Sequence, residues 1–106
     1  MKVKKFVQEI ESINGSSTSI PILISGDMHK EYSISNINYS QNTLVKLIAG
    51  SKSDISLDEF NKILAKISTT RSNATIVVHI ADLYHIDHIK IDDGIIKIII
   101  GGEVKK

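Results

Sequence analysis

The sequence predicts an α+β domain of two tandem α-β-β-β repeats, each a helix followed by three strands. We expect an antiparallel sheet with both helices on one face. Three observations predict this class: an excess of isoleucine, a self-similarity between the two halves of the chain, and apolar spacing that changes from helical to strand periodicity in each half. Isoleucine occurs 21 times, against six leucines and six valines, and this β-branched bias favours sheet.

The two halves of the chain match each other at a period of about 52 residues, which indicates an internal duplication. The matched positions are Val3, Phe6, Ile10 and Ile13 with Leu57, Phe60, Leu64 and Ile67, then Tyr32 and Ile34 with Tyr84 and Ile86, and finally segment 44–48 with 95–99. The repeats cover about residues 1–50 and 54–102. Because a unit of about 50 residues buries too little core alone, we expect one domain over residues 1–106 with pseudo-two-fold symmetry.

An amphipathic helix opens each unit. Apolar residues at three- and four-residue spacing share one helical face in segment 3–13 and again in segment 57–67. Ser56 and Glu59 fit a capping box that starts the second helix, because each side chain can satisfy a free backbone amide. Asn14-Gly15 is expected to end the first helix.

Three strands follow each helix. They are expected at 20–25, 31–39 and 43–49, and then at 75–80, 84–91 and 95–100. The apolar alternation changes phase within both middle strands, which predicts a β-bulge at Ser35-Asn36 and another at Asp87-His88. Asp92-Asp93-Gly94 predicts a tight hairpin between the last two strands.

Charge and composition exclude several classes of function. Thirteen basic residues against twelve acidic ones give a net charge of +1, which provides no electrostatic basis for binding nucleic acid or a membrane surface. The chain has no cysteine, no glycine-rich phosphate loop and no nucleophile elbow. It also has no apolar run of membrane-spanning length and no signal-peptide cleavage pattern. We therefore expect a cytoplasmic protein that is not an enzyme and uses no cofactor.

Three of the four histidines fall within ten residues and form a candidate metal site. If residues 81–83 make a short turn, His79 faces His85 across two strands, with Cβ atoms about 4.5–5.5 Å apart. Asp87 then lies on the same face and His88 lies at the bulge. Imidazole and carboxylate ligands suit zinc or another divalent metal. The same residues also fit a polar surface patch without a metal, which is the interpretation that we favour.

An apolar outer face of the sheet is the second candidate site. Strand alternation assigns three residues of the last strand to the core: Ile96, Ile98 and Ile100. It leaves outside four large aliphatic side chains and the lysine between each pair of them: Leu44, Lys46 and Ile48, and Ile95, Lys97 and Ile99. Such a face favours contact with a protein, including a homodimer, whereas closure of the sheet into a barrel would hide it without a partner.

The tip of the first hairpin is a further candidate contact point. It carries Met28 and His29 in a loop two residues longer than its counterpart in the second unit. A tolerated insertion is the alternative interpretation of this loop.

The first half of the chain resembles the start of short uncharacterised phage and mobile-element proteins. The residues that carry the resemblance are Met1-Lys-Val-Lys-Lys-Phe-Val-Gln-Glu-Ile-Glu-Ser-Ile, a polar loop, an Ile-rich strand and Glu31-Tyr-Ser-Ile. Those proteins have a Pro/Asp loop where this chain has Ser16-Ser-Thr-Ser. The resemblance implies an accessory protein of a mobile element. Together with the apolar outer face and the absence of catalytic motifs, it leads us to expect a non-enzymatic protein-interaction module that modulates a host protein. The alternative is a small-ligand or divalent-metal-binding protein that uses His79, His85 and Asp87.

Overall fold

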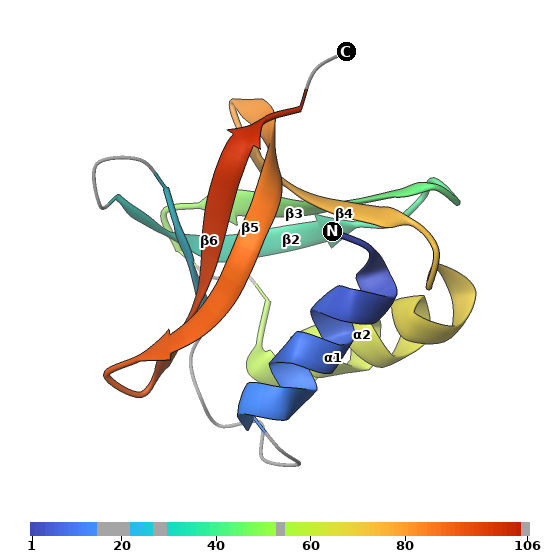
Figure 1. Ribbon diagram of the computed structural model, residues 1–106, viewed down its shortest axis with the longest axis horizontal. Helices are drawn as coiled ribbons and strands as arrows, with labels where there is room; N and C mark the ends of the chain where they lie inside the picture. Colours follow the sequence, from blue (N-terminus) through green and yellow to red (C-terminus); the bar gives the residue numbers. More distant parts are fainter. Residues whose placement is uncertain (15–21, 27–29, 53–54, 105–106) are drawn as a thin grey trace.

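The described part of the chain forms two helices and six strands, in the order helix, three strands, helix, three strands (Figure 1). The computed structural model describes residues 1–14, 22–26, 30–52 and 55–104. The elements are α1 (Val3–Asn14), β1 (Ile22–Ser25), β2 (Glu31–Asn38), β3 (Leu44–Gly50), α2 (Leu57–Thr70), β4 (Thr75–Ile80), β5 (Asp82–Asp92) and β6 (Ile95–Glu103). The predicted α+β class is confirmed, and the elements begin and end within a few residues of their expected bounds.

The six described strands close into a barrel. Their order around the ring follows the chain, β1-β2-β3-β4-β5-β6, and β6 returns to pair with β1. Two seams are parallel, β3 with β4 and β1 with β6, while the other seams are antiparallel. The expected antiparallel sheet is therefore wrong, because the sheet is mixed and closed. The parallel pairing of β3 with β4 follows from α2. This helix carries the chain back to the end of the barrel where β3 began, so that β4 runs in the same direction as β3.

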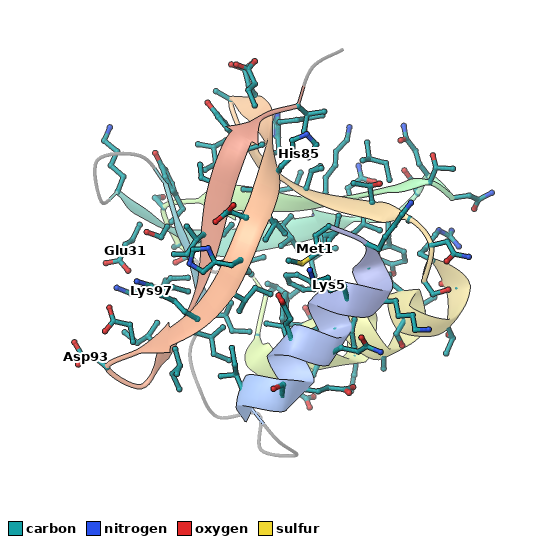
Figure 2. The ribbon with its side chains drawn as sticks, viewed as in Figure 1. Met1, Lys5, Glu31, His85, Asp93 and Lys97 are labelled. Carbon is teal, nitrogen blue, oxygen red and sulfur yellow. The ribbon has the colours of Figure 1, made fainter. Side chains whose placement is uncertain are left out.

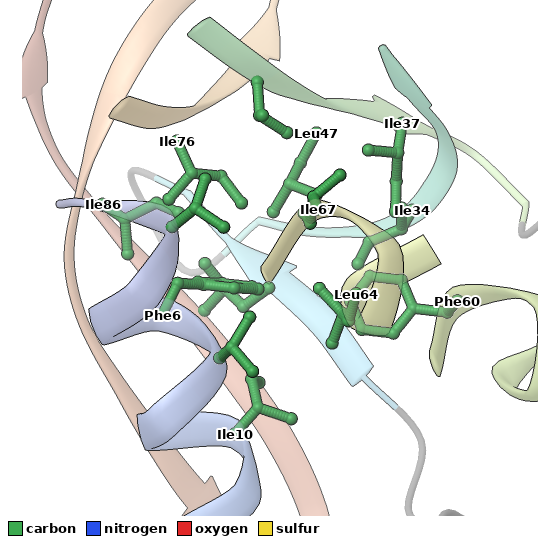
Figure 3. Packing of buried hydrophobic residues seen from close by; sticks show 14 of the residues in the cluster. Phe6, Ile10, Ile34, Ile37, Leu47, Phe60, Leu64, Ile67, Ile76 and Ile86 are labelled. Carbon is green, nitrogen blue, oxygen red and sulfur yellow. The ribbon is translucent and has the colours of Figure 1, made fainter. Parts of the chain in front are cut away.

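The inner wall of the barrel and the apolar faces of both helices share one core (Figure 3). α1 and α2 contact each other and lie together on one side of the strands (Figure 1). The largest fully buried side chains come from both helices and from the strands: Phe6, Ile24, Leu47, Ile67, Ile76, Ile96 and Ile98. Ile100 is partly buried against the same cluster, so the predicted inward face of the last strand is confirmed. Each fully buried isoleucine contributes about 1.5–3 kcal/mol to the free energy of unfolding.

The Ser56 half of the predicted capping box and both predicted bulges are present. The hydroxyl oxygen of Ser56 accepts a hydrogen bond from the amide of Glu59 at 3.1 Å, which marks the start of α2. In β2 the pairing register shifts between Ile34 and Asn36, and in β5 a shift lies between Ile86 and His88. These bulges keep the apolar residues on the inner face of the barrel on both sides of the irregularity.

The first two residues extend the barrel wall beside β4. The amide of Ile76 donates to the carbonyl of Met1 at 2.9 Å, and Lys2 pairs with Thr75 in an antiparallel bridge. Met1 and Lys2 lie beside the start of β4, where β5 does not pair with it, because the β4–β5 ladder covers only residues 77–80 of β4. This pairing fixes the entry of α1 onto the barrel.

The β5–β6 hairpin ends in a two-residue turn. Asp92 pairs with Ile95, and the residues between them, Asp93 and Gly94, have positive φ angles of 52° and 75°. Two successive positive φ angles are typical of a type I′ turn, whose twist matches that of the flanking strands. The predicted hairpin is confirmed.

Gly94→Ala is expected to lower the free energy of unfolding by about 1–2 kcal/mol, because a Cβ atom is strained at positive φ. Gly102→Ala is the matched control: an added Cβ meets no heavy atom within 4 Å at either position, and only Gly94 has positive φ. Urea unfolding of both variants measures the difference. Equal losses of stability would contradict a conformational origin.

Candidate functional site

The predicted pairing of His79 with His85 is wrong. His79 pairs with Leu83, and His85 pairs with Val77, so the two imidazoles are not directly opposite each other. The cause is a tighter hairpin than expected: Ile80 pairs with Asp82, and Ala81 forms the tip with a φ of 62°. Because the register moves by two residues, both histidines keep the outer face but lose their opposed positions.

Asp87 and His88 do meet at the bulge of β5. His88 Nδ1 lies 2.6 Å from Asp87 Oδ2, and both side chains are exposed. Among the described residues, no group of three or more histidine, aspartate or glutamate side chains is close enough to hold a metal ion. The bulge therefore places one histidine–carboxylate pair on the surface, apart from His79.

A cleft of about 960 Å³ gathers other polar residues at the closed end of the β4–β5 hairpin. Its lining includes Lys46 of β3, His79 of β4, Asp82 and Leu83 of the hairpin, and Glu103 of β6. The amide of Val104 donates to the carbonyl of Leu83 at 2.8 Å, so the end of β6 continues as one wall. An imidazole, an ammonium group and two carboxylates can hydrogen-bond a polar ligand there. Asp82 lies between His79 and His85 in the sequence, whereas spacing did not reveal Glu103, which the pairing of β6 with β5 sets beside Tyr84.

The predicted outer aliphatic residues lie on two opposite sides of the barrel. Leu44 and Ile48 belong to β3, whereas Ile95 and Ile99 belong to β6, three strands away in either direction around the ring. All four are half-buried. Barrel closure therefore divides them into two smaller surfaces, one on β3 and one on β6.

Lys97 lies between Ile95 and Ile99 and forms ion pairs with both neighbouring carboxylates. Its Nζ atom lies 3.3 Å from Asp92 Oδ2 and 3.5 Å from Glu31 Oε2, and the lysine and Glu31 lie on the same side of the molecule (Figure 2). The hydrogen bond to Asp92 is the main cause that raises the pKa of Lys97 above 10.5, and desolvation opposes it. The β6 surface therefore carries a lysine whose charge is balanced within the surface. The link to Glu31 depends on ring closure, which sequence spacing does not encode.

The hairpin-tip contact and the membrane-spanning segments are the two remaining points of the sequence analysis. Met28 and His29, the predicted hairpin-tip contact, lie outside the described residues. Among the described helices, none is both long enough and apolar enough to span a membrane.

Comparison with known proteins identifies no relative. No protein-family model matches the chain, and no curated protein or solved structure shows significant similarity to it.

Zinc is expected to bind no more tightly to the native chain than to the His85→Ala variant, because His79 and His85 are not opposed. Isothermal titration of zinc into both proteins measures this difference. A stoichiometric site in the native chain that disappears in the variant would contradict the prediction and support the metal-binding alternative.

Proposed function

We propose that the chain is a protein-interaction module without enzymatic activity, and that its contact surface is the outer face of β6. The observation that carries the proposal is the row Ile95, Lys97 and Ile99, in which two half-buried aliphatic side chains flank a lysine paired with Asp92 and Glu31.

The balanced charge of Lys97 is what makes this surface suitable for contact with a protein. The centres of protein interfaces are depleted of charged residues and favour apolar side chains. Here the ammonium group has two carboxylate partners within the surface, and only 21% of the lysine side chain is exposed. A partner that covers Ile95 and Ile99 would therefore not leave an unpaired cation buried.

A homodimer is the simplest assembly through this face. A two-fold interface uses the same patch on both subunits. Because Lys97 offsets one of the two carboxylates, Asp92 and Glu31, each copy of the patch brings a net charge of only −1 to the contact, which limits the repulsion between two copies.

The proposal also includes a duplicated origin for the domain, with tandem repeats at about residues 1–50 and 54–102 and pseudo-two-fold symmetry. Three observations support it. Each half has the order helix, three strands; each middle strand has a bulge at the matching place; and the two parallel seams, β3–β4 and β1–β6, are half a ring apart. A two-fold axis through the barrel would exchange these seams.

The resemblance of the first half to phage and mobile-element proteins supports an accessory role in the cytoplasm, in which the module modulates a host protein. A second candidate function is the binding of a small polar ligand. The cleft that contains His79, Asp82 and Glu103 favours it.

Ile99→Lys is expected to convert a dimer into a monomer, because it replaces an aliphatic contact with an ammonium group that the interface would have to desolvate. Light scattering after size exclusion, at concentrations up to the high micromolar range, measures the mass. Ile48→Lys makes the same change on the opposite side of the barrel and should leave the dimer intact. A native chain that stays monomeric, or two variants that dissociate equally, would contradict the proposed surface.

A further inference from the structure

A second concave site lies where the end of α2 meets the turn between β2 and β3. This pocket has a volume of about 580 Å³, within the range of about 300–1,000 Å³ that is typical of small-molecule sites. We call it the Lys66–Arg71 pocket. Besides these two cations, its lining includes Asn36, Asn38 and Tyr39. None of the described lining residues carries a carboxylate.

Arg71 is held in place by backbone oxygens. Its Nε atom donates to the carbonyl of Gln41 at 3.1 Å, and its Nη1 atom donates to the carbonyl of Thr70 at 3.1 Å. These bonds use two of the five N–H donors of the guanidinium group. Its charge is not neutralised, because no described carboxylate forms an ion pair with it. The only arginine of the chain is thus oriented in the pocket, and these two bonds leave three of its N–H donors for a ligand.

Lys66 supplies a second positive charge. Its Nζ atom lies 5.5 Å from the centre of the Tyr39 ring, which is a cation–π contact, and no described carboxylate pairs with it either. By contrast Lys62, one turn earlier on α2, pairs with Asp58 at 3.2 Å. Within the described ranges, Lys62 therefore has a carboxylate partner, whereas Lys66 and Arg71 have none.

The C-terminal end of a helix normally repels anions, because its last carbonyl groups carry partial negative charge. At the end of α2 the carbonyl groups of Lys66, Ile67 and Thr70 accept hydrogen bonds. The hydroxyls of Thr69 and Thr70 both donate to the carbonyl of Lys66, and the amide of Arg71 donates to the carbonyl of Ile67. The Arg71 side chain covers the carbonyl of Thr70. The repulsion is thereby reduced where the two cations lie.

We propose that the Lys66–Arg71 pocket binds the phosphate monoester group of a small molecule. A phosphate monoester carries a charge of about −1.5 to −2 at neutral pH, which two cations match, whereas a carboxylate would leave one cation unbalanced. The arginine fork suits two phosphate oxygens, lysine acts as a point charge, and the Asn36 and Asn38 amide groups are further donors. The Tyr39 ring, which also lines the pocket, offers contact for the rest of the molecule. This inference does not depend on the proposed protein-interaction function.

The test is a titration of the ¹⁵N-labelled chain with inorganic phosphate at constant ionic strength. Saturable shifts of the amide signals of residues 36–41 and 66–71 are expected. Phenyl phosphate should bind more tightly than inorganic phosphate, and acetate at least tenfold more weakly. Acetate binding as tightly as phosphate, exclusion of phenyl phosphate, or shifts that do not saturate would overturn the proposal.

Charge-removing variants assign the binding to these side chains. Lys66→Gln should weaken phosphate binding at least tenfold, and Lys62→Gln, on the same helix, should not change it. Arg71→Gln should also weaken binding, but it removes two hydrogen bonds to the backbone, so Lys66→Gln is the decisive variant. Equal affinities for Lys66→Gln and Lys62→Gln would contradict the assignment.

Discussion

The parallel pairing of β1 with β6 is the contact on which the rest of the structure depends. All four residues of β1 pair with β6, in a register that sets Ile22 beside Ile96 and Ile24 beside Ile98. This seam joins the first described strand to the last and closes the ring, so every strand acquires an inner and an outer face. It gives the isoleucine-rich strands one shared interior and removes the open edges at which a flat sheet would pair with other chains.

Much of the fold could be predicted because local physical rules determine it. Period-two alternation assigned Ile96 and Ile98 to the core, and the turn preference of Asp93-Gly94 identified the last hairpin. The phase change at Ser35 and its counterpart identified both bulges. Barrel closure could not be predicted in this way. The seams that close it join residues far apart in sequence, and the aliphatic outer positions of β3 and β6 fit an open sheet equally well.

The candidate sites were less predictable, since each depends on long-range geometry. The position of His79 relative to His85 required the hairpin register, which Ala81 at positive φ shifts by two residues. Sequence reasoning identified Lys97 as an outward residue, but its partner Glu31 is brought near only by the β1–β6 seam. The hydrogen bond from Arg71 Nε to the carbonyl of Gln41 joins residues that are thirty positions apart, and spacing in the sequence gives no signal for it.

The order in which the seams form has a consequence for synthesis on the ribosome. β1 pairs on one side with β2, which follows it directly. Its other side stays unpaired until β6, the last described strand, emerges from the ribosomal tunnel. Until Ile96 has been translated, the nascent sheet has an unpaired edge that is rich in aliphatic residues. Partly synthesised chains on neighbouring ribosomes can join through such edges. Slow translation of the second half would therefore prolong the aggregation-prone stage, whereas the complete barrel is protected by its own closure.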